Sequence, residues 1–151
     1  MNTPVSRLIR SDGQVVSVRA EVMVDQAVET MVDQNVGSIV VLDSDEILIG
    51  IFTERDLLRR VVGKNLIPGK TTIESVMTRN VFVVDRTADR RDVHQMMDSE
   101  HIRHIPIVDE GTVLGVVSLR DVLRSENAEK EFELTQLKGY VSDKPYPSYP
   151  G

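Results

Sequence analysis

The chain has 151 residues, with no cysteine, no tryptophan and only 4% aromatic residues. Without cysteine there can be no disulfide framework, no thiolate zinc site and no cysteine nucleophile. The few aromatic rings offer little on which the bases of a single-stranded nucleic acid could stack. No apolar run approaches the roughly 20 residues that a membrane-spanning helix needs. We therefore expect a protein with no membrane association and no catalytic or structural metal.

Positive charge is also scarce, because 18 Lys and Arg stand against 24 Asp and Glu, for a net charge of −6. This balance argues against nucleic acid as a partner, since nucleic-acid binding usually needs a basic face, but it allows a local cationic pocket. The first seven residues lack the basic and apolar regions of a secretory signal. Together with the absence of cysteine, this predicts a cytoplasmic location.

One pattern occurs twice in the sequence. Residues 49–59 (Ile-Gly-Ile-Phe-Thr-Glu-Arg-Asp-Leu-Leu-Arg) match residues 114–124 (Leu-Gly-Val-Val-Ser-Leu-Arg-Asp-Val-Leu-Arg) position by position in chemical type. Upstream, residues 38–43 match residues 104–109 in the same way. A duplication of this kind predicts two copies of one supersecondary unit.

Each copy is predicted to fold as β-α-β-β-α, which places the chain in the α/β (α+β) class. The unit begins with a short strand at 15–18 or 81–84, followed by a helix at about 25–35 or 89–101. Two β-branched strands come next, and a second helix follows Thr53 or Ser118. Because one such unit has too small a core, we expect the two units to pack together. The predicted divisions are 5–62 for the first repeat, 63–72 for a linker, 73–126 for the second repeat and 127–151 for a tail.

The tail differs from both repeats. Ser125 and the residues after it resemble the start of a further helix, which Gly139 would end. Residues 144–151, rich in proline and tyrosine, are predicted to be extended or disordered. The charge runs at 89–92 and 126–133 are typical of solvated helix faces.

The repeated hydroxyl-x-Arg-Asp element, at 53–56 and 118–121, is the sharpest motif. A hydroxyl residue three positions before an acid is a capping-box pattern, so helix capping alone explains much of it. However, a helix start also attracts anions, and a neighbouring arginine adds charge-assisted hydrogen bonds. A carboxylate there can accept hydrogen bonds from vicinal ribose hydroxyls. Capping does not explain why Arg55 and Arg120 recur at one place.

The order and spacing of these motifs resemble a tandem pair of cystathionine β-synthase (CBS) domains, as a stand-alone two-repeat module. The resemblance covers about residues 5–126 and rests on residues 50–56, 115–121 and 103–109, and on residues 73–78, which open the second repeat. Residues 5–9 look like a degraded copy of residues 73–77.

The resemblance implies a pseudo-twofold disc with two clefts that bind adenosine-containing ligands such as AMP, ADP, ATP, S-adenosylmethionine or NAD. It further implies a regulatory, signal-transducing homodimer that senses a metabolite and has no catalytic cofactor. By the family pattern, Asp56 and Asp121 would bind ribose, while Thr53 and Ser118 would bind phosphate. The full set of implied ligand-binding residues is Val15, Val36, Gly37, Ser38, Thr53, Arg55 and Asp56 in one repeat and Val81, Ile102, Arg103, His104, Pro106, Ser118, Arg120 and Asp121 in the other.

The first repeat departs from the pattern, because Gly37 and Ser38 stand where the second has Arg103 and His104. We therefore expect the two clefts to differ in affinity or in ligand. Two other classes remain open: a structural module that binds an unidentified protein partner, with Thr53 and Ser118 as simple caps, and an enzyme. The enzyme is disfavoured because the sequence has no Gly-x-Ser-x-Gly elbow and no phosphate-binding loop motif.

Overall fold

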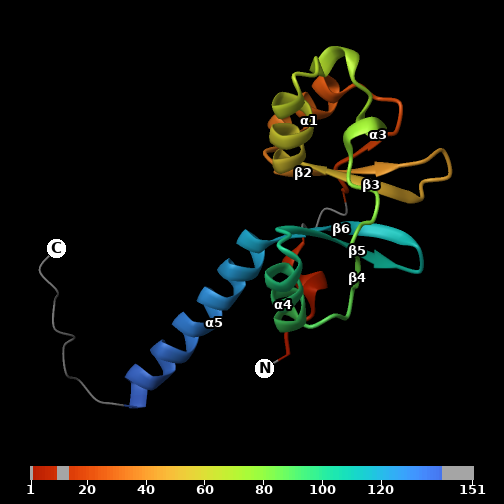
Figure 1. The fold of residues 1–151 in the computed structure, drawn as a ribbon. Coiled ribbons are helices and arrows are strands. Elements are labelled where there is room, and N and C mark those ends of the chain that lie inside the picture. The colour runs from red at the N-terminus through yellow and green to blue at the C-terminus, as the bar shows by residue number, and fades with distance from the viewer. Residues whose placement is uncertain (1, 10–13, 141–151) are drawn as a thin grey trace, which may run out of the picture.

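A computed structural model describes residues 2–9 and 14–140 (Figure 1). It contains two three-stranded sheets, in which the first two strands are parallel and the last two antiparallel. The first sheet consists of β1 (Ser17–Arg19), β2 (Ser38–Leu42) and β3 (Leu48–Thr53), and the second of β4 (Val84–Asp85), β5 (His104–Asp109) and β6 (Thr112–Ser118).

Helices connect and extend the strands. The first repeat contains α1 (Val24–Gln34) and, after β3, the short α2 (Glu54–Asp56), which continues as the π-helical turn η2 (Leu57–Val61) and the 3-10 turn η3 (Val62–Lys64). The second repeat contains α4 (Arg90–Glu100) and the long α5 (Leu119–Tyr140). Three short segments precede the first strands of the repeats: η1 (Val5–Leu8) opens the first repeat, η4 (Pro68–Lys70) lies in the linker and α3 (Ile73–Val76) opens the second repeat. The β-α-β-β-α order predicted for each repeat is confirmed.

The two sheets face each other, with α1 and α3 outside one sheet and α4 outside the other (Figure 1). In β2 every side chain is buried, and alternate side chains point to opposite faces. Ile39 and Val41 pack in the cluster beneath the helices, whereas Val40 and Leu42 join Val113 of the other sheet. Burial on both sides explains why this strand is uniformly apolar.

The repeats exchange their opening segments. Val5 of η1 is fully buried in the core of the second repeat, and its amide donates to the carbonyl of Ala88 at 2.9 Å. Ile73 of α3 is fully buried in the core of the first repeat, and its amide donates to the carbonyl of Val22 at 2.8 Å. The likeness of residues 5–9 to residues 73–77 therefore reflects equivalent places in the two cores.

Three boundaries differ from the prediction. The first strands are β1 and β4, so Val15, Val16 and residues 81–83 lie outside them. The expected helix start at Ser125 was wrong, because α5 runs without interruption through residues 119–140 and crosses the expected boundary at 126/127. Ser125 does not cap a helix, since its hydroxyl accepts a hydrogen bond from Arg90. The extended tail predicted for residues 144–151 lies outside the described residues.

A close approach in the first core gives a testable prediction. A Cβ placed on Gly50 would lie 2.3 Å from Sδ of the buried Met77. Gly50→Ala should therefore overpack this core and lower the free energy of unfolding by about 1–3 kcal/mol. Urea unfolding of Gly50→Ala, Met77→Ala and the double variant should show that the two losses do not add, because Met77→Ala makes room for the new methyl group. Strictly additive losses would contradict this packing.

Candidate functional site

Both repeated motifs lie where the last strand of a repeat gives way to a helix. Thr53 Oγ1 accepts from the amide of Asp56 at 3.3 Å, and the Asp56 carboxylate accepts from the amide of Thr53 at 3.0 Å. In the second repeat, Ser118 Oγ accepts from the amide of Asp121 at 3.1 Å, and the Asp121 carboxylate accepts from the amide of Ser118 at 2.9 Å. The capping boxes that the sequence suggested are therefore present at both junctions.

Backbone hydrogen bonds bring further predicted residues to these junctions. The amide of Glu54 donates to the carbonyl of Gly37 at 3.1 Å, and the amide of Leu119 donates to the carbonyl of Arg103 at 2.8 Å. The segment before the middle strand thus lies against the helix start in each repeat. In α5, the amides of Leu119 and Asp121 have partners, whereas that of Arg120 has none among the described residues. This leaves one of the first three helical amides for an anion.

The residues predicted to hold the base do not form one kind of surface. Val15 is half-buried and packs in the cluster between the two sheets. Val81 and Ile102 are half-buried, and Ile102 packs on the core of the second repeat. Pro106, which belongs to the implied ligand-binding set but was not assigned to the base, is buried within β5, where it pairs with Val116 of β6. The structure therefore assigns Val15 and Pro106 packing roles, whatever else they contact.

His104 marks the place where the two repeats meet. It begins β5 and lies opposite Ser118 in the ladder with β6. A Cβ on Gly37 would lie 3.1 Å from Nε2 of His104 and 3.4 Å from Oε1 of Glu54, so these three residues are neighbours across the seam. Because glycine lacks a side chain, His104 can approach the first repeat here. Sequence reasoning missed Glu54, although it stands where the second repeat has Leu119.

Charged groups around His104 come from both repeats. Burial lowers the pKa of His104, while the carboxylates of Glu54 and Asp121 oppose this change and the Arg103 guanidinium adds to it. The imidazole therefore favours its neutral form in the folded chain. An anion bound beside His104 would favour the protonated form instead.

The arginines of the two motifs are used differently. Arg55 Nη1 donates to the carbonyl of His101 at 3.0 Å, which ties the first repeat to the second. The side chains of Arg103 and Arg120 are exposed, and neither guanidinium makes a hydrogen bond or ion pair within residues 2–9 and 14–140. Two cations near Asp121 are thus available to an anionic ligand, whereas Arg55 already has a structural contact.

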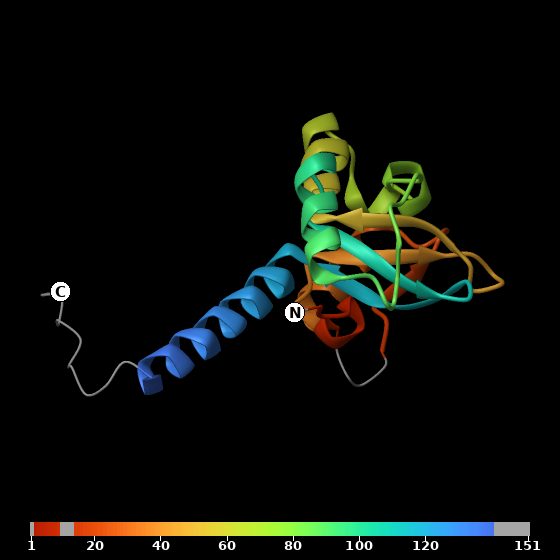
Figure 2. The same cartoon turned by 90° about the horizontal axis from the view of Figure 1, so that it is seen from below.

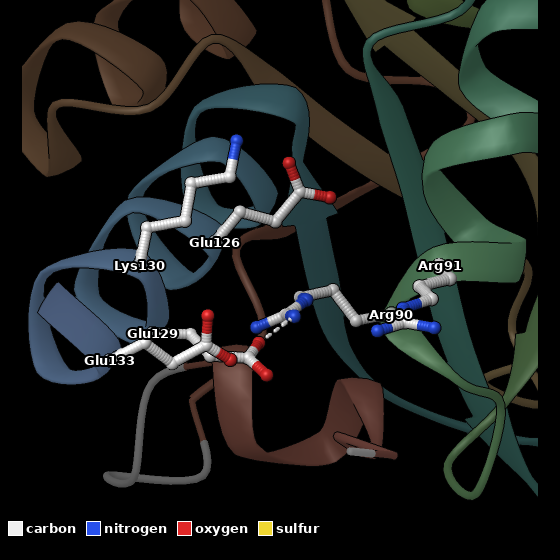
Figure 3. Close-up of a pocket in the computed structure, with 6 residues that line it drawn as sticks. All are labelled: Arg90, Arg91, Glu126, Glu129, Lys130 and Glu133. Atoms are coloured by element: carbon white, nitrogen blue, oxygen red, sulfur yellow. Dashed lines mark hydrogen bonds and ion pairs between the residues drawn. The ribbon is translucent and has the colours of Figure 1, made fainter. Parts of the chain in front are cut away.

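A hollow of about 300 Å³ lies elsewhere, between α4 and α5 (Figure 3). Arg90 is only 4% exposed and pairs with Glu129 and with Ser125, and His94 Nδ1 lies 2.8 Å from Glu126 Oε1. The expectation that the charge runs at 89–92 and 126–133 are simply solvated was therefore wrong, because they meet and fasten α5 to α4. None of the predicted ligand-binding residues lines this hollow, whose lining is Arg90, Arg91, Glu126, Glu129, Lys130 and Glu133.

Two properties of the described part of the chain concern metal sites and membrane helices. No group of three or more His, Asp or Glu side chains there could hold a metal ion. No described helix combines the length and the apolar character needed to cross a bilayer.

The environment of His104 predicts a pH dependence of stability. Because its pKa is lowered on folding, the unfolded chain takes up more protons as the pH falls below about 6.5. The free energy of unfolding should therefore decrease between about pH 7.5 and about pH 5.5, and by less in His104→Ser, which copies Ser38. His101→Asn, which copies Asn35 at the equivalent helix end, is the matched control and should keep the wild-type slope. Identical slopes for wild type and His104→Ser would contradict this assignment.

Comparisons with known proteins agree with this geometry. The mitochondrial CBS domain-containing protein CBSX3 of Arabidopsis thaliana is 31% identical over 149 residues, which cover 93% of this chain and 72% of that protein. The crystal structure of the CBS-domain containing protein ATU1752 from Agrobacterium tumefaciens shares 31% identity and a TM-score of 0.76, over 83% of this chain and 95% of that one.

A third comparison concerns the fold alone. The CBS domain pair of protein MJ0100, solved with 5′-methylthioadenosine and S-adenosyl-L-methionine, has a TM-score of 0.77 at 24% identity and covers 85% of this chain and 99% of that one. The family model of the CBS domain matches the present chain at residues 5–63 and again at 73–127. The chain therefore belongs to the CBS domain family and carries two CBS domains in tandem.

Proposed function

We propose that this CBS pair is a non-catalytic regulatory module that binds an adenosine-containing nucleotide at the junction around Asp121. The observation that carries the proposal is the grouping of a half-buried carboxylate, a capping hydroxyl and several cations at one helix start. Asp121 and Ser118 face each other there, with His104, Arg103 and Arg120 close by in the chain or in the sheet.

These groups suit the parts of a nucleotide. The Asp121 carboxylate can accept hydrogen bonds from two vicinal ribose hydroxyls. The amide of Arg120 and the cationic side chains of Arg103, Arg120 and protonated His104 can bind phosphate. The base would lie against Val81 and Ile102. AMP, ADP, ATP and NAD all carry this set of groups, and the bound ligands of the MJ0100 pair are also adenosine compounds.

The junction of the first repeat has a related set of residues at the equivalent positions: Asp56, Thr53 and Arg55, with Val36 and Gly37 before its middle strand and Ser38 at the start of that strand. A ligand that touched both repeats would stabilise the arrangement that holds it best, and this shift would be the signal. We place this module in the cytoplasm, and we assign it no metal or catalytic cofactor.

We also propose that the module works as a homodimer. Val32 of α1 is 72% exposed, and Leu58 and Val62, one turn apart in η2 and η3, are 64% and 58% exposed. Apolar side chains this exposed on helices are costly in water and are typical of surfaces that a partner covers.

A second candidate is a structural module that binds another protein. The observation that favours it is α5, which leaves the body of the protein (Figure 2) and carries exposed Phe132, Leu134 and Leu137. The two hypotheses differ in one measurement, because only the first predicts heat of binding with nucleotides. Isothermal titration with AMP, ADP, ATP and NAD at up to about millimolar concentration is that test. No heat and no thermal shift with any of the four would refute nucleotide binding.

The ribose role of Asp121 predicts the effect of a single substitution. Asp121→Ala should weaken nucleotide binding by about 1–3 kcal/mol, because the ribose hydroxyls would still lie against the protein but would have no hydrogen-bond acceptor there. Asp98→Ala, which removes an exposed carboxylate from α4, should leave the affinity unchanged and controls for net charge. Titration calorimetry measures both, and equal affinities of Asp121→Ala and wild type would rule out the ribose contact.

The homodimer proposal predicts the molecular mass of the protein in solution. Light scattering after size-exclusion chromatography should give twice the 17.0 kDa of one chain. Val62→Glu should shift the protein toward the monomer, because a charge would be buried in the interface. Gln95→Glu, an exposed change on α4, adds the same charge and should leave the mass unchanged. A wild-type protein that elutes as a monomer at every concentration would contradict the proposal.

A further inference from the structure

The two motif carboxylates stand at equivalent positions but differ in how fully they are used. Asp56 is 8% exposed, and both of its oxygens have partners. Asp121 is half-buried, and its carboxylate accepts a hydrogen bond from the described residues at Oδ2 alone. We propose that the nucleotide is taken up at Asp121 alone, and that Thr78 closes the equivalent site at Asp56. This inference rests on the proposed nucleotide binding.

Thr78 is held rigidly against Asp56. Its amide donates to the carbonyl of Ile51 at 2.9 Å, and the amide of Ile51 donates to its carbonyl at 3.0 Å. Thr78 Oγ1 lies 3.3 Å from Oδ1 and 3.5 Å from Oδ2 of Asp56, so its single proton is shared by both carboxylate oxygens. Because Thr78 follows α3, the exchanged segment itself carries this contact into the first repeat.

Other donors complete the set around Asp56. Thr53 supplies its amide at 3.0 Å and its hydroxyl at 3.2 Å, both to Oδ2. Arg60 Nε lies 3.6 Å from Oδ1, and Arg60 Nη1 also donates to the carbonyl of Met77 at 2.8 Å. A ribose could reach this carboxylate only by displacing Thr78, which would leave a half-buried hydroxyl without its acceptor. The Asp56 carboxylate therefore acts as a tie between α2, β3 and the segment after α3.

The surroundings of Asp121 favour an anionic ligand instead. Arg103 and His104 stand where the first repeat has Gly37 and Ser38, so this pair of side chains has no cationic counterpart there. By the spacing of residues 5–9 and 73–77, the counterpart of Thr78 is Arg10, which lies outside the described residues. Thr78, which the second repeat contributes to the first core, thus sets how many nucleotides one chain binds.

The number of bound nucleotides tests this inference. Native mass spectrometry and calorimetry of the full chain with AMP should give one AMP per chain. Thr78→Ala removes the hydroxyl that donates to Asp56 and exposes the Asp56 carboxylate. The variant should therefore bind two AMP per chain. Thr72→Ala is the matched control, because Thr72 is a half-buried threonine of the same segment whose side chain makes no capping bond. This control should still bind one AMP.

Combining Thr78→Ala with a substitution of Asp121 distinguishes the two sites. Thr78→Ala with Asp121→Asn should bind one AMP, whereas Asp121→Asn alone should lose at least about tenfold in affinity. Two AMP per wild-type chain, or one AMP per folded Thr78→Ala chain, would overturn the role of Thr78. If Thr78→Ala melts below the assay temperature, Thr78→Val removes only the hydroxyl donor and carries the same expectation. A wild-type chain that binds none of the four nucleotides would instead refute the proposed function itself.

Discussion

The exchange of η1 and α3 between the repeats is the constraint from which the other features follow. Val5 fills the core of the second repeat and Ile73 that of the first, so neither core is complete without a segment from outside it. The sheets also bury a shared apolar layer that includes Val40 and Val113. Together these contacts fix the two strand-to-helix junctions relative to one another, and His104 meets Gly37 as a result.

On this near-symmetric frame, a few substitutions make the halves different. Val24 begins α1 in full burial, whereas Arg90 at the same place in α4 is paired with Glu129 of α5. A buried cation must be matched by a charge, and Glu129 supplies that charge to Arg90 from α5. The two repeats also differ where they meet, because Glu54 of the first repeat stands where the second repeat has Leu119. The frame thus positions two equivalent strand-to-helix junctions, and a handful of residues makes them different.

Much of the fold was visible in the sequence because it depends on local patterns. The duplication, the β-branched strands and the hydroxyl-x-Arg-Asp junctions predicted the two units and both capping boxes. The contacts that distinguish the sites could not be predicted, since they join residues far apart in the chain: Thr78 with Asp56, Arg55 with His101 and Arg90 with Glu129. The continuity of α5 was missed because Ser125, which looks like a cap, serves instead as a partner of Arg90.

A crystal structure of the full chain with AMP tests the account most directly. We expect the ribose hydroxyls on the Asp121 carboxylate, with the phosphate near Ser118 and the guanidinium of Arg103, and Thr78 still hydrogen-bonded to Asp56. AMP bound at Asp56, or in the hollow between α4 and α5, would contradict it.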